Sequence, residues 1–204
     1  MDLKLKVRSS FDETIDTINN SYNLLVGQLL HATTLVHDRI KQGSKVLLCG
    51  NGGSAGDAQH LASELINRFE IDRGALAAVS IVSDINVLTA ISNDYGYQYI
   101  FARQIEALGK NDDILISFST SGNSENVING IRAAQKIGMN VIAFGGRGGG
   151  QVSKLLREAD ISLCVPSEST ARIQEIHLLL IHNMCMSIDS MLYNKLYTGS
   201  ISGP

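Results

Sequence analysis

The sequence predicts an α/β protein in which a doubly wound, five-stranded parallel sheet follows an N-terminal helical extension. Short apolar runs recur along the chain, helix-length periodic segments separate most of them, and clusters of Gly, Ser, Asn and Asp bound them. The runs are residues 45–49, 76–81, 113–118, 140–144 and 160–165. Runs that are apolar almost throughout are typical of parallel strands covered by helices on both faces. We expect this domain to span residues 43–195.

The two ends of the chain predict long helical segments. Residues 1–42 contain no Pro and no Gly before Gly27, which favours a helical extension. Its apolar residues recur at spacings of three and four, at Phe11, Ile15, Ile18, Tyr22, Leu25 and Leu29. Residues 171–193 predict an unusually apolar closing helix, and residues 196–204 a loose tail. These helices offer more apolar surface than one such domain can cover, so we expect the chain not to be a monomer.

Composition excludes several classes of protein. With 17 Lys and Arg against 20 Asp and Glu, the net charge of -3 is too small to predict a nucleic-acid partner. No apolar run approaches the roughly 18 residues that span a bilayer, and the first residues do not resemble a signal peptide. We therefore expect a cytoplasmic protein without membrane contact. Cys49, Cys164 and Cys185 are far apart among apolar neighbours, so we expect reduced, buried thiols.

The usual strand order, 2-1-3-4-5, would place ligands beyond the ends of the first and third strands. After the third strand, hydroxyls cluster before a helix expected over residues 123–136. They belong to Ser119, Thr120, Ser121 and Ser124. The unpaired amides of a helix N-terminus and its dipole favour an anion, so this loop predicts a phosphate site without Lys or Arg. The alternative is that one hydroxyl merely caps the helix.

The loop after the first strand is glycine-rich. Asn51, Gly52, Gly53 and Ser54 form a tight turn into a helix. No Lys follows the glycines and no GxGxxG pattern is present, so nucleotide chemistry is disfavoured. The glycines either provide the turn alone or also let a ligand approach the backbone.

Polar residues recur on the two helices that would flank this edge of the sheet. His60, Glu64 and Arg68 follow one another every four residues, an arrangement shared by metal-chelating pairs and ordinary surface pairs. On the closing helix, Gln174, His177 and His182 lie among apolar residues, where polar groups need partners. Gln174 and His182 are about 12 Å apart along an ideal helix. Either the start of that helix bends inward, or one of the two serves a neighbouring subunit.

Four segments resemble the sugar isomerase (SIS) domain of the bacterial phosphoheptose isomerases. They are CGNGGSAGDAQH (49–60), VLTAISNDYGY (87–97), STSGNS (119–124) and ARIQEIHLLLIH (171–182), and the similarity covers about Lys45 to Asp189. The resemblance implies a flavodoxin-like sheet and a homotetramer with sites at subunit interfaces. It also implies conversion of sedoheptulose 7-phosphate to D-glycero-D-manno-heptose 7-phosphate, which feeds heptose synthesis for lipopolysaccharide.

The resemblance also implies roles for individual residues. The ligands of one Zn²⁺ ion per subunit would be His60, Glu64, Gln174 and His182. Glu64 and His182 would in addition act as catalytic base and acid. The substrate contacts would be Asn51, Gly52, Gly53, Ser54, Glu64, Asn93, Asp94, Ser119, Thr120, Ser121, Ser124 and Gln174, to which we add Arg68. The GGRGGG stretch (145–150) is richer in glycine than the corresponding turn of the family.

A non-enzymatic relative that binds the replication initiator is also similar, notably in INRFE, VLTAI and ARIQE. By this resemblance, that relative lacks residues matching Glu64 and His182, and both are present here. The enzymatic interpretation therefore leads, with a sugar-phosphate-binding or initiator-binding SIS module as the alternative.

The expected chemistry agrees with these residue types. Moving a carbonyl between adjacent carbons requires a base, an acid that shuttles a proton between oxygens, and stabilisation of the enediolate charge. A carboxylate, an imidazole and a divalent cation supply these functions, and His and carboxylate ligands suit zinc. Without an ion, His182 would need a direct hydrogen bond to Glu64 or to a backbone carbonyl.

Overall fold

A computed structural model describes residues 2–193 and contains the predicted parallel sheet. The strands are β1 (Val46–Gly50), β2 (Ala78–Ser80), β3 (Ile114–Ser119), β4 (Asn140–Gly146) and β5 (Ile161–Val165). Their order is β2-β1-β3-β4-β5 and every pair is parallel. Fold class and strand order are therefore confirmed. The expected tail, residues 196–204, lies outside the described residues.

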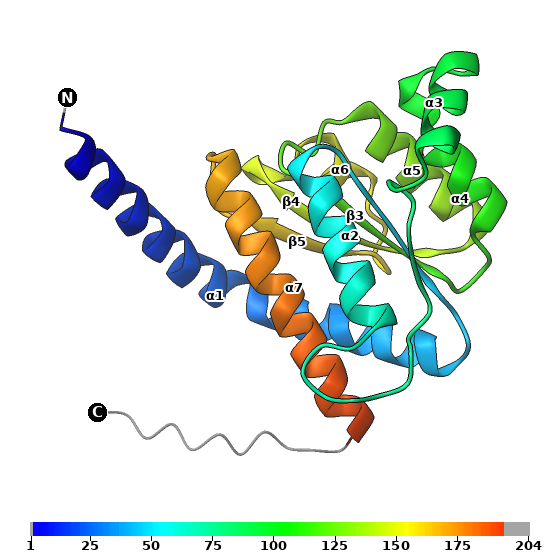
Figure 1. Cartoon of the computed structure of the whole chain (residues 1–204), viewed down its shortest axis with the longest axis horizontal. Helices are drawn as coiled ribbons and strands as arrows, with labels where there is room; N and C mark the ends of the chain where they lie inside the picture. The colour runs from blue at the N-terminus through cyan, green and yellow to red at the C-terminus, as the bar shows by residue number, and fades with distance from the viewer. Residues whose placement is uncertain (1, 194–204) are drawn as a thin grey trace.

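Helices cover both faces of the sheet (Figure 1). They are α1 (Leu3–Lys41), α2 (Gly53–Ile66), α3 (Ile85–Asp94), α4 (Ala102–Leu108), α5 (Glu125–Ile137), α6 (Gly150–Leu155) and α7 (Thr170–Tyr193). Helices α1, α2 and α7 lie on one face, while α4, α5 and α6 lie on the other. Short 3₁₀ turns occur at Tyr97–Tyr99 and Arg147–Gly149. The expected helical extension is thus present as a single helix, α1.

The two sides of the sheet bury separate hydrophobic cores. Along β1, Val46 and Leu48 face α1, α2 and α7, whereas Leu47 and Cys49 face α4 and α5. Successive side chains of a strand point to opposite faces, so a run that is apolar throughout supplies both cores. This explains why β1 and β3 are buried at every position.

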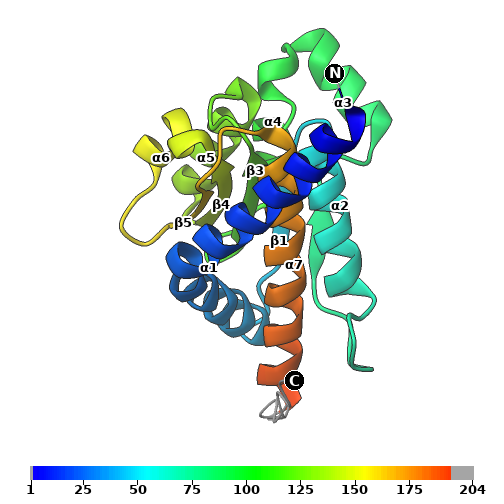
Figure 2. The same cartoon turned by 90° about the vertical axis from the view of Figure 1, so that its left-hand side faces the viewer.

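Helix α1 buries only part of its predicted apolar stripe against its own domain. Leu25 and Leu29 are buried as expected, but Phe11, Ile15 and Tyr22 are 68%, 55% and 70% exposed. The first half of α1 instead turns Thr17 and Ser21 toward the domain. Figures 1 and 2 show why: this half projects past the sheet and crosses α7 instead of lying along the domain. Periodicity predicts a helix with an apolar face, but not which part of that face its own domain covers.

Three further expectations need correction. Strand β2 is shorter than residues 76–81, because the amide of Leu76 donates to the carbonyl of Leu65 and not to the sheet. Strand β4 continues through the first two glycines of the GGRGGG stretch to Gly146. Cys49 and Cys185 are buried, but Cys164 is only half-buried.

Candidate active site

The loops after β1 and β3 begin side by side at the carboxyl edge of the sheet, where Gly50 pairs with Phe118. Helix α2 begins at Gly53 after Gly52, whose φ of +56° favours glycine. A Cβ atom on Gly53 would meet the end of the Gln174 side chain on α7, which would have to move. Besides forming the tight turn, this glycine therefore lets Gln174 lie against the start of α2.

Asn51 joins the two loops. Its side-chain amide exchanges hydrogen bonds of 2.8 Å with that of Asn126 in the first turn of α5, in both directions. The hydroxyl of Tyr97 donates to Asn51 Oδ1 at 2.9 Å. Asn126 and Tyr97 were missed by the sequence reasoning, although an Asn in the first turn of a helix at the switch point was an available signal. The Asn51–Asn126 pair thus ties the loop after β1 to the start of α5 and holds the two loops in a fixed relative position.

The serine-rich loop is organised by hydrogen bonds between its own hydroxyls and backbone amides. Ser119 Oγ accepts from the amide of Gly122 at 3.2 Å and lies 3.4 Å from Ser124 Oγ. Ser121 Oγ accepts from the amide of Asn123 at 3.2 Å. Ser124 is the N-cap residue of α5, yet its side chain makes no capping hydrogen bond. The alternative that this hydroxyl is only a helix cap is therefore not supported, and it remains available to an anion at the start of α5.

The glycine-rich stretch after β4 packs against this loop. The amide of Val152 donates to the carbonyl of Gly122 at 2.9 Å, and that of Gln151 to Asn123 Oδ1 at 3.1 Å. A Cβ atom on Gly150 would lie 2.8 Å from the same Asn123 oxygen. The extra glycines thus permit the close contact that supports the serine-rich loop.

His60, Glu64 and His182 meet between α2 and α7. The Nε2 atoms of His60 and His182 are 3.0 Å apart, a hydrogen bond in which one ring donates. His60 Nε2 lies 3.6 Å from Glu64 Oε1. Phe69, from the segment after α2, stacks on the His182 ring with centroids 5.6 Å apart. His182 therefore has a direct partner, but it is His60 and neither Glu64 nor a backbone carbonyl.

The distances around His60 also bear on metal binding. Two nitrogens bound at about 2.0–2.1 Å to one tetrahedral zinc ion are about 3.3 Å apart. The 3.0 Å between His60 and His182 is close to that value. Within residues 2–193, however, no three His, Cys, Asp or Glu side chains form a ready-made cluster for an ion. Gln174 packs at Gly53, the first residue of α2, whereas His60 lies two turns further along that helix.

Asp57 and His177 form a further polar pair between α2 and α7. His177 is fully buried, and its Nε2 donates to the carbonyl of Gly145 at 3.0 Å. His177 Nδ1 then faces Asp57 Oδ2 at 4.0 Å. Burial raises the pKa of Asp57 to about 6 and lowers the pKa of His177 to about 4. His177 is thus the satisfied core histidine expected for this helix, apart from this one atom.

Three predicted substrate contacts lie outside these clusters. Helix α2 ends at Ile66, so Arg68 does not continue the row of His60 and Glu64 but lies exposed in the following segment. Asn93 donates to Asp94 at 2.8 Å at the exposed end of α3. Within the described chain, no hydrogen bond or ion pair connects these three residues to the two loops or to His60. A contact with substrate from these positions remains a prediction.

Known proteins match this chain in sequence and architecture. The chain matches the SIS domain family over residues 11–146. It is 48% identical to the phosphoheptose isomerase of Dechloromonas aromatica, over 94% of this chain and 98% of that protein. The solved phosphoheptose isomerase of Neisseria gonorrhoeae is 45% identical, with a TM-score of 0.88 and 92% and 99% of the two chains covered. That of Francisella tularensis is 39% identical, with a TM-score of 0.91 and 93% and 100% covered.

The chain is therefore an SIS-domain protein. Within that family it belongs to the phosphoheptose isomerases, and it is an enzyme. The non-enzymatic alternatives lose their support, because relatives matched over nearly their whole length are named as isomerases. Within residues 2–193, no helix combines the length and apolar character needed to cross a membrane.

Proposed function

We propose that the protein interconverts sedoheptulose 7-phosphate and D-glycero-D-manno-heptose 7-phosphate. The observation that carries this proposal is the meeting of His60, Glu64 and His182 across α2 and α7, where α2 begins at the glycine turn that lies beside the hydroxyl-rich loop after β3. An acid/base pair next to an anion site suits an aldose–ketose isomerisation of a sugar phosphate. The product would enter heptose synthesis for lipopolysaccharide in the cytoplasm.

In the proposed mechanism, the serine-rich loop and the first turn of α5 bind the phosphate. Glu64 then removes a proton from C1 of the ketose and returns it to C2. Meanwhile His182 gives a proton to the oxygen on C2 and accepts one from the oxygen on C1. The intermediate is an enediolate, and no atom is gained or lost between substrate and product. The helix N-terminus fixes the distant phosphate, so its binding energy can orient the reacting carbons.

We propose that a zinc ion binds at His60, Glu64 and His182. Two imidazoles and one carboxylate are suitable zinc donors, and the separation of the two Nε2 atoms supports their sharing an ion. When bound, the ion would polarise the carbonyl and stabilise the enediolate charge. Gln174, the fourth ligand implied by the resemblance, contacts Gly53 in this chain. We therefore propose that it reaches the ion of a neighbouring copy.

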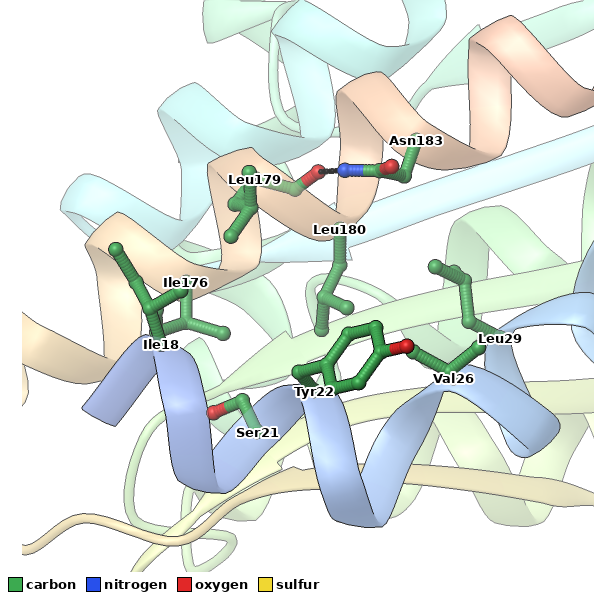
Figure 3. A pocket seen from close by; sticks show the side chains of 9 residues that line it. All are labelled: Ile18, Ser21, Tyr22, Val26, Leu29, Ile176, Leu179, Leu180 and Asn183. Carbon is green, nitrogen blue, oxygen red and sulfur yellow. Dashed lines mark hydrogen bonds between the residues drawn. The ribbon is translucent and has the colours of Figure 1, made fainter. Parts of the chain in front are cut away.

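We further propose that the chain forms a homotetramer. One exposed apolar surface is the groove between α1 and α7 (Figure 3), a pocket of about 130 Å³. Its lining residues are Ile18, Ser21, Tyr22, Val26, Leu29, Ile176, Leu179, Leu180 and Asn183. A second surface is α3, which has no buried residue and exposes Ile85 by 74%. Two separate apolar surfaces suit the two kinds of isologous interface in a tetramer of paired dimers.

An assay of the purified protein tests the proposed reaction. Incubation with sedoheptulose 7-phosphate should produce the aldose phosphate, which chromatography separates from the ketose of equal mass. Fructose 6-phosphate, one carbon shorter, serves as the matched control substrate and should react much more slowly. Absence of any conversion of the heptose phosphate would contradict the proposal.

A further inference from the structure

Arg73 and Asp189 form a buried ion pair that the proposed chemistry does not use. Arg73 Nε donates to Asp189 Oδ1 at 2.7 Å, and both side chains are 2% exposed. Arg73 follows α2 in the chain, while Asp189 lies on α7, two turns beyond His182 on the same face. The pair therefore joins the two helices that carry Glu64 and His182.

The arginine closes the end of α2. Its Nη2 donates to the carbonyl of Glu64 at 2.7 Å and its Nη1 to that of Leu65 at 2.9 Å. These carbonyls belong to the last turn of α2, where no amide of the helix can reach them. Because the guanidinium donates hydrogen bonds to these carbonyls, it fixes the backbone of Glu64, the residue proposed as the base.

The aspartate organises the segment between α2 and β2. Its Oδ2 accepts from the amides of Glu70 and Ile71 at 3.3 and 3.2 Å. These residues directly follow Phe69, whose ring stacks on His182. The carboxylate of Asp189 thus holds in place the backbone that presents Phe69 to the proposed acid.

We propose that Arg73 and Asp189 are positioning residues for the isomerase site, an inference that rests on the proposed function. Arg73 sets the position of Glu64 through the end of α2, and Asp189 sets the ring of His182 through Phe69. A simple structural pair would contribute to folding alone. A positioning pair would also change turnover when the fold is kept.

The double variant R73M/D189L separates these two roles. Replacing a buried ion pair by apolar residues of similar size often preserves stability, whereas removing one partner leaves an unpaired buried charge. We expect the melting temperature of the double variant to exceed that of D189L alone. Its two apolar side chains can neither cap α2 nor hold the two amides, so kcat should still fall about tenfold or more, with KM changed less than about threefold.

The Arg157–Asp160 pair provides a matched control. Arg157 Nη2 donates to Asp160 Oδ1 at 2.9 Å and to the carbonyl of Met139, and Asp160 accepts from the amide of Val141. This pair has the same chemistry but lies near the start of β4, at the opposite edge of the sheet from the site. R157M/D160L should change the melting temperature without changing kcat.

NMR of His182 gives a readout that does not depend on turnover. The ring of Phe69 shifts the resonances of the stacked imidazole, which are assigned by their loss in H182Q. R73M/D189L should move these resonances and R157M/D160L should not. If the wild-type enzyme fails to isomerise the heptose phosphate, the proposed function fails, while the resonances still test the positioning.

Unchanged kcat together with unchanged His182 resonances in R73M/D189L would overturn the inference. If the double variant does not fold, Asp189→Asn takes its place, because it keeps the size of the side chain but removes the charge that pairs with Arg73. We expect Asp189→Asn to move the His182 resonances and to lower kcat about threefold or more. Wild-type values for both would overturn the inference equally.

Discussion

The Asp57 carboxyl and the His177 imidazole face each other between α2 and α7, with Oδ2 and Nδ1 4.0 Å apart. Both atoms are buried, and within residues 2–193 neither has a hydrogen-bond partner. At that distance the two groups interact electrostatically without a hydrogen bond. With a pKa of about 6 for Asp57 and about 4 for His177, the carboxyl takes up a proton before the imidazole does as the pH falls.

The first prediction concerns the pH dependence of stability. Between pH 3.8 and about 6, folded Asp57 holds more proton than the unfolded chain, so its contribution falls as pH rises. Between about 4 and 6.5, folded His177 holds less proton, so its contribution grows as pH rises. The two slopes oppose each other in the wild-type protein. Asp57→Asn removes the first, so stability should then rise more steeply from pH 4 to 6.5.

Urea unfolding at several pH values measures this effect. Between pH 4 and 6.5, the free energy of unfolding of the Asp57→Asn variant should rise by roughly 1–2 kcal/mol more than that of the wild type. This figure allows for the partial exposure of the carboxyl. Parallel stability curves for the two proteins would show that Asp57 titrates normally.

The second prediction concerns the base. Glu64→Gln keeps the shape of the side chain but cannot accept the proton, so kcat should fall by about 10² or more while substrate still binds. Steady-state kinetics and a binding titration check both parts. Glu106→Gln, an exposed glutamate on α4, is the control and should retain turnover. Near-wild-type turnover for Glu64→Gln would rule out this base.

The third prediction concerns the phosphate. Replacing Ser121 or Ser124 by Ala removes a hydrogen bond to an anion, which contributes about 1.5–3 kcal/mol. KM should therefore rise at least about tenfold for each variant. Ser153→Ala is the control, since its hydroxyl donates to the carbonyl of Gly150 on α6. An unchanged KM in both test variants would mean that the hydroxyls do not contact phosphate.

The fourth prediction concerns assembly. Light scattering at micromolar concentration should give a mass well above the 22.0 kDa of one chain. Tyr22→Asp places a charge on a side chain that is 70% exposed and lines the groove between α1 and α7, so it should lower that mass. Lys136→Asp on α5 makes a charge change elsewhere and should not. A wild-type mass near 22.0 kDa would refute self-association.

The fifth prediction concerns zinc. Chelation should lower activity, and added zinc should restore it. His60→Ala should lose zinc without unfolding, because the His60 side chain is 38% exposed and its removal leaves no large cavity. Elemental analysis and circular dichroism follow metal and fold separately. Full activity after exhaustive chelation, with no zinc detected, would leave Glu64 and His182 as a metal-free acid/base pair.

Several parts of the site were predictable because they depend on local pattern. Strands buried on both faces are apolar throughout, and parallel crossovers place their carboxyl ends at one edge. The serine-rich loop and the glycine turn could therefore be assigned to that edge before any contact was known. Tyr97, Asp57 and the Arg73–Asp189 pair carry no such pattern, since each acquires its partner only through folding.

By itself, the sequence determined the alternation of strands and helices and, given the usual strand order of such sheets, the two loops that flank the switch point. Only the tertiary structure decided where α2 ends, since Arg73 caps it from seven residues beyond Ile66. It also decided that α1 leaves Phe11 and Tyr22 exposed, and that His60 meets His182 across 122 residues of chain. The spacing of apolar residues in the sequence indicates which face of a helix is apolar. The packing of helices against one another selects which residues of that face are buried and which polar groups meet.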